Sequence, residues 1–207
     1  MNGDLEDERE EMLRVAKLAL RVRMFLYYTA SSYAFFVYAL SVISLALIGA
    51  YIDEKTGRTG VYTSTFSVIG LLLASTLFIW ILRKVARAVG EEAVQTSGAR
   101  GAIKATLLLV VAPVLAAFLV GFIYPPAAAH SWYPALGLFL VALYIQSGRQ
   151  PHMRPHLLAG TIIILTSPPA LYAMSTKLTV GLMGLSYLIA GAYAAHLGLN
   201  EIEIRSE

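Results

Sequence analysis

Long apolar stretches, separated by short polar connections, dominate the pattern of hydrophobic and polar positions along the chain. A helix of about 20 apolar residues is long enough to cross roughly 30 Å of membrane hydrocarbon. The stretches are mostly continuous rather than alternating with a period of two, and each is too long for a strand of a membrane barrel. The pattern therefore predicts an all-α protein, a polytopic helical bundle in a membrane. The six predicted transmembrane helices are residues 25–52, 61–82, 103–124, 132–148, 157–175 and 178–198.

Residues 1–24, which precede the first predicted span, have the charge pattern of an amphipathic helix. Acidic residues fill its beginning and basic residues its end, an order that complements the helix dipole. Arg14, Lys17 and Arg21 recur at steps of three and four and share one face, while apolar residues occupy another. The helix is expected to be either a topological anchor or an elbow that transmits motion into the first span. The predicted domains are the N-terminal helix 1–24, the six-helix domain 25–198 and a tail at 199–207.

The distribution of Lys and Arg among the connections predicts which way the spans face. Basic residues close to a span resist transfer across the membrane and stay on the cytoplasmic side. The chain has 16 Lys and Arg residues, and all but Lys55, Arg58 and Lys177 fall on one side of the predicted bundle. The N-terminal helix and the tail, and so both termini, are therefore expected in the cytoplasm. The protein is expected to be a multi-pass protein of the cell (plasma) membrane, with the lipid bilayer as its first partner.

The amino-acid composition excludes several classes of protein. Hydrophobic residues make up 57% of the chain and charged residues only 14%, whereas ordinary soluble domains are about 25% charged, so a soluble enzyme is excluded. The charges separate apolar runs instead of clustering on one face, so nucleic acid is not expected as a partner. The 207 residues include no Cys, which excludes disulfides, iron–sulfur clusters and cysteine nucleophiles. Asn and Gln are also scarce, a composition typical of thermophile proteins.

Charged side chains are missing where self-powered transport or catalysis would need them. No Asp, Glu, Lys or Arg lies in the middle of a predicted span, although such groups usually mark ion pathways and proton relays. A self-contained proton pump or cation-coupled carrier is therefore not predicted. The sequence also has no Gly-x-Ser-x-Gly, no His-Glu-x-x-His and no phosphate-binding loop. Neither an enzyme nor a metal site is expected, and any ATPase would be a separate subunit.

The connection between the second and third spans, residues 83–104, is the longest internal polar segment. Its helical pattern continues to about Ala88, breaks at Gly90 and offers a short lateral helix after that break. Such a helix is a candidate docking site for a partner, with a loop held to the lipid headgroups as the alternative. An acidic pair, the short helix and a Thr-x-x-x-Arg stretch run into the third span as Glu91, Glu92, Thr96, Arg100 and Lys104.

Around this segment, the chain resembles the ABC-type export permeases of the type-two class. The resemblance extends to the amphipathic N-terminal helix and to the six spans with cytoplasmic ends. The resemblance implies the membrane-embedded half of an ATP-driven exporter, whose ATPase is a separate cytoplasmic subunit. The chain departs from the family between its last two spans, where the family usually has a long outer segment with re-entrant helices. In this sequence Met174, Ser175 and Thr176 are almost all that joins them.

Two features mark candidate walls of a translocation path. In the first span, Ser31, Tyr38 and Ser41 belong to one narrow stripe, at steps of three and four, that is expected to face protein. The third and fifth spans contain interior prolines, which remove backbone donors and liberate carbonyl groups. Matching helix breaks point to transporter sites, and close packing of the bundle is the alternative. The prolines are Pro113, Pro168 and Pro169.

Two histidines offer an alternative chemistry. His156 and His196 are expected at similar depth on adjacent antiparallel helices, the arrangement that a bis-histidine haem b would need. The other interpretation treats them as interfacial residues at helix ends. His152 lies four residues before His156, but Pro155 interrupts the pair and makes it a poor metal motif.

The leading hypothesis from the sequence is therefore a membrane-embedded subunit of a transport system. It is expected to carry no cofactor of its own and to assemble as a homo- or hetero-oligomer. A haem b-binding electron-transfer subunit and a non-catalytic membrane scaffold are the alternatives.

Overall fold

The chain folds into long helices that run side by side. The computed structural model describes residues 2–57, 61–88, 115, 119–125 and 130–203, and every regular element within these ranges is helical. The elements are α1 (Asn2–Thr56), α2 (Val61–Ala88), α4 (Trp132–Gln146), the short 3₁₀ helix η3 (Pro151–Met153), α5 (Arg154–Ala173) and α6 (Thr176–Ile202).

Within the described residues, three helical stretches are long and apolar enough to cross a membrane. They are Glu8–Thr56 within α1, Pro151–Ala173 over η3 and α5, and Thr176–Ile202, which is α6. α4 is apolar as well but has only 15 residues. Because a helix satisfies its own backbone hydrogen bonds, it is the element that lipid permits. These elements indicate an all-helical membrane protein, as the sequence predicted, whereas the count of six spans stays a prediction.

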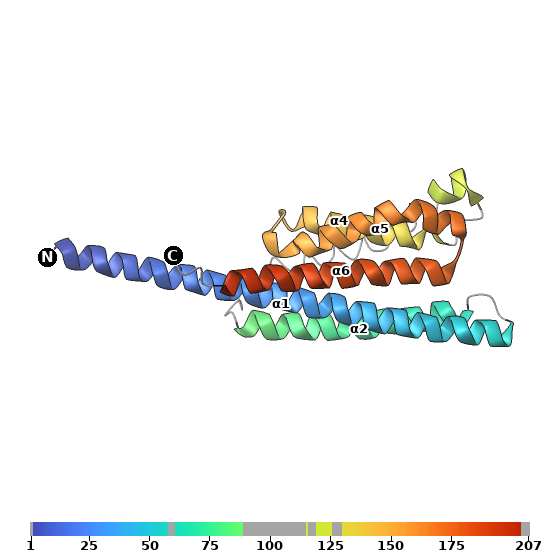
Figure 1. Cartoon of the computed structure of the whole chain (residues 1–207), viewed down its shortest axis with the longest axis horizontal. Coiled ribbons are helices and arrows are strands. Elements are labelled where there is room, and N and C mark those ends of the chain that lie inside the picture. Colours follow the sequence, from blue (N-terminus) through green and yellow to red (C-terminus); the bar gives the residue numbers. More distant parts are fainter. Residues whose placement is uncertain (1, 58–60, 89–114, 116–118, 126–129, 204–207) are drawn as a thin grey trace.

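α1 lies between α2 and α6 and packs along both of them. α5 in turn packs against α6 and α4, so that the helices follow one another as α2, α1, α6, α5 and α4 through successive contacts. The N-terminal part of α1 extends past the ends of the other helices (Figure 1). At the point where it leaves the bundle, Phe25 and Tyr28 lie against Gly198 near the end of α6. The bundle thus begins at about residue 25.

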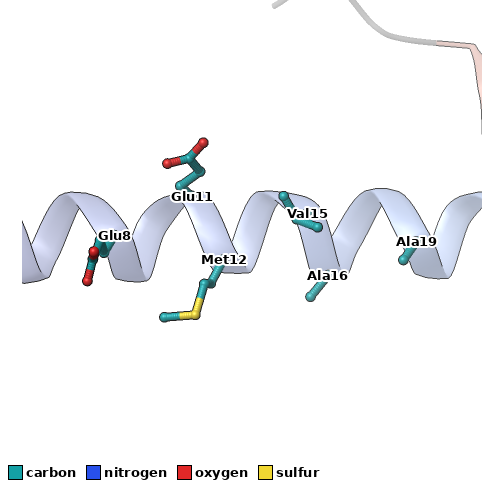
Figure 2. Close-up of a pocket in the computed structure, with 6 residues that line it drawn as sticks. All are labelled: Glu8, Glu11, Met12, Val15, Ala16 and Ala19. Atoms are coloured by element: carbon teal, nitrogen blue, oxygen red, sulfur yellow. The ribbon is translucent and has the colours of Figure 1, made fainter.

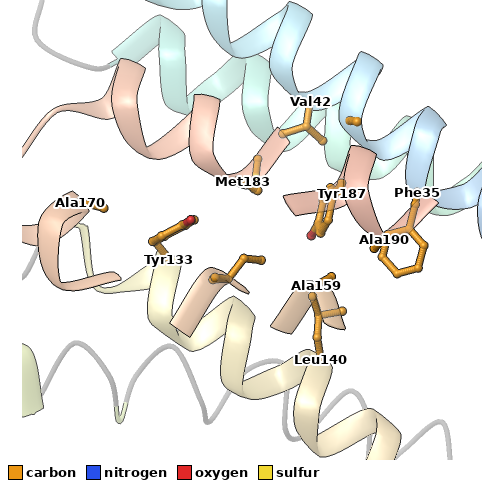
Figure 3. Packing of buried hydrophobic residues seen from close by; sticks show 11 residues of the cluster. Phe35, Val42, Tyr133, Leu140, Ala159, Ala170, Met183, Tyr187 and Ala190 are labelled. Atoms are coloured by element: carbon orange, nitrogen blue, oxygen red, sulfur yellow. The ribbon is translucent and has the colours of Figure 1, made fainter. Parts of the chain in front are cut away.

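A core of buried apolar side chains lies between α1, α4, α5 and α6 (Figure 3). Small residues line much of it, which lets these helices approach closely in a lipid environment, where packing rather than the hydrophobic effect drives association. The cluster consists of Phe35, Ala39 and Val42 of α1, Tyr133 and Leu140 of α4, Ala159, Ile163 and Ala170 of α5, and Met183, Tyr187 and Ala190 of α6.

Glycines lie at two close helix crossings. A Cβ added to Gly160 of α5 would lie 2.7 Å from the carbonyl oxygen of Gly137 in α4. A Cβ on Gly49 of α1 would lie 2.5 Å from the carbonyl oxygen of Tyr62 in α2. Real side chains essentially never come so close to backbone atoms, so only glycine fits at these crossings.

Two helices continue through positions where the sequence suggested a boundary or a helix break. α1 passes without a break through residue 24, the predicted boundary between the N-terminal helix and the first span, because no Gly or Pro lies near that boundary. α5 includes Pro168 and Pro169 within its helical range. Just before them, the hydroxyls of Thr166 and Ser167 donate to the carbonyls of Ile162 (2.8 Å) and Ile163 (2.7 Å).

Candidate functional site

Hydroxyl-bearing side chains from four helices lie in the centre of the bundle. Tyr133 and Tyr187 belong to the buried apolar cluster, and Tyr38 packs against it. The ring centroids of Tyr38 and Tyr187 are 6.0 Å apart in an edge-to-face arrangement, which is the geometry that aromatic pairs favour. We call this group the hydroxyl cluster; its members are Tyr38 of α1, Tyr133 of α4, Thr166 of α5, and Ser186 and Tyr187 of α6.

The hydroxyls of Thr166 and Ser186 donate to backbone carbonyls of their own helices. The Thr166 hydroxyl donates to the carbonyl of Ile162 at 2.8 Å, and its oxygen lies 2.7 Å from the hydroxyl of Tyr133. Because the single proton of Thr166 is engaged with Ile162, Tyr133 is the donor to Thr166. Ser186 donates to the carbonyl of Leu182 at 2.7 Å. The cluster therefore links α4 to α5 through a neutral hydrogen bond inside an apolar interior.

The hydroxyl cluster has a definite chemical character. All of its members are neutral donors and acceptors on rigid or short side chains, and Tyr133 and Ser186 are 0% exposed. Such groups can contact a polar, uncharged solute, and they can satisfy the backbone of moving helices. Because no carboxylate, imidazole or amine belongs to the cluster, it has no member that would take up a proton at neutral pH.

The other translocation-path candidates fall on different sides of the bundle. Ser31 is buried, and the backbone carbonyl of Ser41 faces the close approach of Gly70 in α2. Pro168 and Pro169 are exposed on α5, two and three residues after Thr166 of the hydroxyl cluster. The stripe of the first span does face protein, as predicted, because none of its members is fully exposed. Pro113 lies outside the described residues.

A second group of side chains lies where α1 meets the start of α5. The rings of Tyr27 in α1 and His152 in η3 stack with centroids 4.9 Å apart, and the Arg23 guanidinium carbon is 5.8 Å from the centroid of the same tyrosine ring. His156 of α5 packs its ring against Phe35, with centroids 4.9 Å apart. These ring contacts hold η3 and α5 against α1.

The two haem-ligand candidates have separate surroundings. The Nδ1 atom of His156 is buried and has no hydrogen-bond partner among the described residues. His196 is exposed on α6, and its Nε2 atom lies 3.3 Å from the amide nitrogen of Asn200. The contacts that the structure gives these two rings are thus with different residues, Phe35 for His156 and Asn200 for His196.

Asp53 is a residue that sequence reasoning missed. Its side chain accepts hydrogen bonds from the backbone N–H groups of Tyr62 (3.0 Å) and Thr63 (2.8 Å) and from the Thr63 hydroxyl (2.7 Å). It is the one charged side chain that is buried, at 6% exposed, in the part of the chain whose burial the structure describes. Next to it, Glu54 forms an exposed ion pair of 2.9 Å with Lys177 of α6. Asp53 therefore caps α2 from α1, and this end of the bundle is tied together.

The docking candidates Glu91, Glu92, Thr96 and Arg100 lie outside the described residues, as does Lys104. Within the described ranges, no group of three or more His, Asp or Glu side chains is placed to hold a metal ion. No protein-family model matches the chain, and no match was found among curated proteins or solved structures.

Proposed function

We propose that the protein is the membrane-embedded subunit of a transport system, the permease of an ATP-driven exporter whose ATPase is a separate cytoplasmic chain. In this proposal the chain crosses the cell membrane six times and both termini are cytoplasmic. The observation that carries the proposal is the hydroxyl cluster. Polar groups inside a membrane bundle are costly and usually serve a pathway or a packing contact. Here they converge from four helices on one interior region.

The chemistry of the hydroxyl cluster supports a transporter that does not supply its own energy. A carrier that is coupled to protons or cations needs ionisable groups at membrane depth, and the predicted spans have none in their middle. The sequence also has no phosphate-binding loop. Energy must then come from another chain, and the segment 83–104 is where such a chain would dock. The membrane subunit itself would contribute the motion of the helices around the hydroxyl cluster.

Reversal of the acidic pair tests whether an ATPase docks on this segment. We expect Glu91→Lys with Glu92→Lys to release an ATPase that co-purifies with the wild-type protein, because like charges brought together at an interface can cost several kcal/mol. The matched control is Glu201→Lys with Glu203→Lys, on the same predicted side of the membrane. The readout is mass spectrometry of proteins captured from solubilised membranes at modest salt, with the thermal melting profile as a check of folding.

The outcomes of this capture experiment separate the hypotheses. Loss of the ATPase from the Glu91 and Glu92 variant alone supports the permease. If the wild-type protein captures no ATPase, or if both variants retain it equally, the docking proposal is wrong. A stable set of other partners would then favour the membrane scaffold.

The haem b alternative has one specific observation in its favour, the buried and unpartnered Nδ1 atom of His156. The permease proposal predicts that protein purified in detergent shows no Soret band. A band that is lost in His156→Ala or His196→Ala would instead establish haem ligation. His130→Ala is the matched control, because its Nδ1 atom is likewise buried and without a partner among the described residues.

A further inference from the structure

Basic side chains from two helices meet around two tyrosines where α1 enters the bundle. The rings of Tyr27 and His152 stack at an interplanar angle of 19°, and the Arg23 guanidinium carbon lies 5.8 Å from the centroid of the same tyrosine ring. Arg154, at the start of α5, is near enough to Tyr28 for its charge to act on the tyrosine hydroxyl. We call these five residues the cationic corner. Both of its arginines are exposed.

The chemistry of the cationic corner suits a phosphate group. Glu201 of α6 is an acidic side chain whose charge also reaches Tyr28. Two arginines against one carboxylate leave these side chains with a net positive charge, even when His152 is neutral. A guanidinium has five N–H donors in a planar fork, so it can serve another partner and still bind two phosphate oxygens.

The contact between a basic side chain and an aromatic ring in this corner recurs at two other places on the bundle. The Lys55 ammonium lies 5.7 Å from the ring centroid of Tyr51, and the Lys84 ammonium lies 5.7 Å from the ring centroid of Trp80. In all three pairs the basic residue is four positions nearer the end of its helix. Tyrosine and tryptophan favour the headgroup layer, and long basic side chains extend from there to water. We therefore expect each pair at a membrane surface.

The distance between the two pairs on α1 fits one bilayer. Tyr27 and Tyr51 are 24 residues apart in this helix, which is about 36 Å at the rise of an α-helix. That length matches hydrocarbon of roughly 30 Å with a ring at each surface. Beyond the cationic corner α1 leaves the bundle (Figure 1). There it carries the exposed carboxylates of Glu8 and Glu11 (Figure 2), which hydrocarbon would not accept. Hydrocarbon therefore ends close to the cationic corner.

The register of α2 against α1 gives the same boundary. Gly49 of α1 approaches the backbone of Tyr62 in α2. Further along, Gly70 of α2 approaches the backbone of Ser41 in α1, in the same antiparallel register. Continued along both helices, this register brings Lys84 level with the cationic corner. Two helices thus place basic side chains at one height.

We propose that the cationic corner binds the phosphate of an anionic lipid headgroup. Basic sites between membrane helices are known to hold such headgroups, and the cationic corner lies at their level. Free phosphate has the same chemistry, but only a lipid is concentrated at this height. Because the two arginines belong to α1 and α5, a bound headgroup would join these helices.

This proposal goes beyond the transport function and does not depend on it. It requires that the cationic corner lie at a membrane surface, whichever side of the membrane that is. The lipid would act as a clamp between two helices, and its binding would be set by the charges of the corner.

Native mass spectrometry of the purified full-length protein measures this binding. Arg23→Gln with Arg154→Gln should raise the dissociation constant for phosphatidylglycerol about tenfold or more, because two charge-assisted contacts are lost. Lys17→Gln with Arg21→Gln is the matched control: it removes two exposed charges from other sides of α1, and it should change binding by less than about twofold. Glu201→Gln should tighten binding, because it removes the opposing charge. Equal effects of the two double variants overturn the proposal.

Spin-labelled lipids in liposomes distinguish a lipid from free phosphate. The wild-type protein should immobilise spin-labelled phosphatidylglycerol more than spin-labelled phosphatidylcholine, and the variant of Arg23 and Arg154 should lose this preference. Excess inorganic phosphate, added at constant ionic strength, should leave the preference unchanged. If inorganic phosphate abolishes it, the corner takes free phosphate and the lipid proposal is wrong.

The melting profile without lipid checks the fold of each variant. Because Arg23 and Arg154 are exposed, their replacement should leave this profile unchanged. If it does not, Glu201→Gln decides, since that variant keeps both arginines. Phosphatidylglycerol bound no more tightly by Glu201→Gln than by the wild type would then overturn the proposal.

Discussion

At the scale of single residues, Asp53 shows how a charge can be buried at the end of a membrane helix. Both carboxylate oxygens are used, Oδ1 by the backbone of Tyr62 and Oδ2 by the backbone and hydroxyl of Thr63. The first N–H groups of a helix have no partner within that helix, and a buried charge is tolerated only when it is hydrogen-bonded. Asp53 and the start of α2 therefore satisfy each other, and this fixes the turn between α1 and α2.

Replacement of Asp53 should destabilise the α1–α2 pair in a graded way. Asp53→Ala removes all three hydrogen bonds and is expected to lower the melting temperature in detergent by several degrees, the usual order for loss of a helix cap. Asp53→Asn keeps one acceptor oxygen and should fall between that variant and the wild type. Melting followed by circular dichroism provides the measurement.

The neighbouring ion pair supplies the control for this prediction. Glu54 and Lys177 are 66% and 61% exposed, and exposed pairs contribute little to stability. Glu54→Gln should therefore leave the melting temperature almost unchanged. If Glu54→Gln lowered the melting temperature as much as Asp53→Ala, the stabilising effect would come from the surface charge of this turn. It would not come from the hydrogen bonds by which Asp53 caps α2.

Some residue environments could be predicted from the sequence, and others could not. The protein-facing stripe of α1, which includes Ser31 and Tyr38, follows from helical periodicity, and the structure confirms that it faces protein. Asp53 escaped prediction because it lies eight residues before the helix that it caps, whereas sequence rules look for a cap directly before the first turn. The ring contacts of His152 and His156 are equally invisible in sequence, because their partners Tyr27 and Phe35 are distant in the chain.

At the scale of helices, the α4–α5 crossing depends on two facing glycines. A Cβ on Gly160 would meet the Gly137 carbonyl oxygen at 2.7 Å and Val141 Cγ2 at 2.9 Å. Backbone atoms cannot move aside as a flexible side chain can, so any larger residue must separate the helices. The hydrogen bond between Tyr133 and Thr166 joins the same two helices, so their separation would also disturb the hydroxyl cluster.

Substitution of Gly160 should therefore be destabilising, although alanine is the better helix former. We expect Gly160→Ala to cost about 1–3 kcal/mol, the range for overpacked sites. Gly181→Ala on α6 is the matched control, because nothing lies within 4 Å of its added Cβ; it should be neutral or stabilising by up to about 1 kcal/mol. Unfolding in mixed detergent provides the comparison. Equal effects of the two variants would show that the crossing is looser than described.

Within the described residues, the bounds of the helices followed closely from the hydrophobic pattern; of the predicted span 103–124, only residues 115 and 119–124 are described. The prediction that the second helix leaves its span and continues as far as about Ala88 is confirmed by α2, which is helical over Val61–Ala88. The unbroken passage of α1 from its charged beginning into the apolar part was not predicted as such, because a change in composition looks like a boundary. Helix formation depends on local backbone preference instead, and this stretch has no residue that breaks it.

At the scale of the whole molecule, contacts between helices hold both ends of the bundle together. Asp53, Glu54 and Lys177 tie one end together, and the stacked Tyr27 and His152 rings tie the other. The hydroxyl cluster lies between these two ends. The side chains that surround it are uncharged. If the proposed transport function is right, the helices would change their packing between these two ends, as alternating access to a buried site requires.

The orientation of the bundle gives the last prediction. Thr56 is exposed at the end of α1, and Gln150 is exposed between α4 and η3, near the opposite end of the bundle. The bias of Lys and Arg predicts that Thr56 lies outside the cell and that Ser97 and Gln150 lie in the cytoplasm. In the cysteine-free chain, an impermeant thiol reagent added to intact cells should therefore modify Thr56→Cys. It should reach Ser97→Cys and Gln150→Cys only after the cells are opened.

The pattern of labelling also tests the number of spans. Ser97 and Gln150 are separated by the third and fourth predicted spans, and two crossings return the chain to the same side of the membrane. Labelling of both from outside, with Thr56→Cys protected, would mean that the bundle is inverted. Labelling of only one of the two would mean an odd number of crossings between them. In that case α4, which at 15 residues is shorter than the roughly 20 that hydrocarbon requires, would be the first helix to remove from the set of spans.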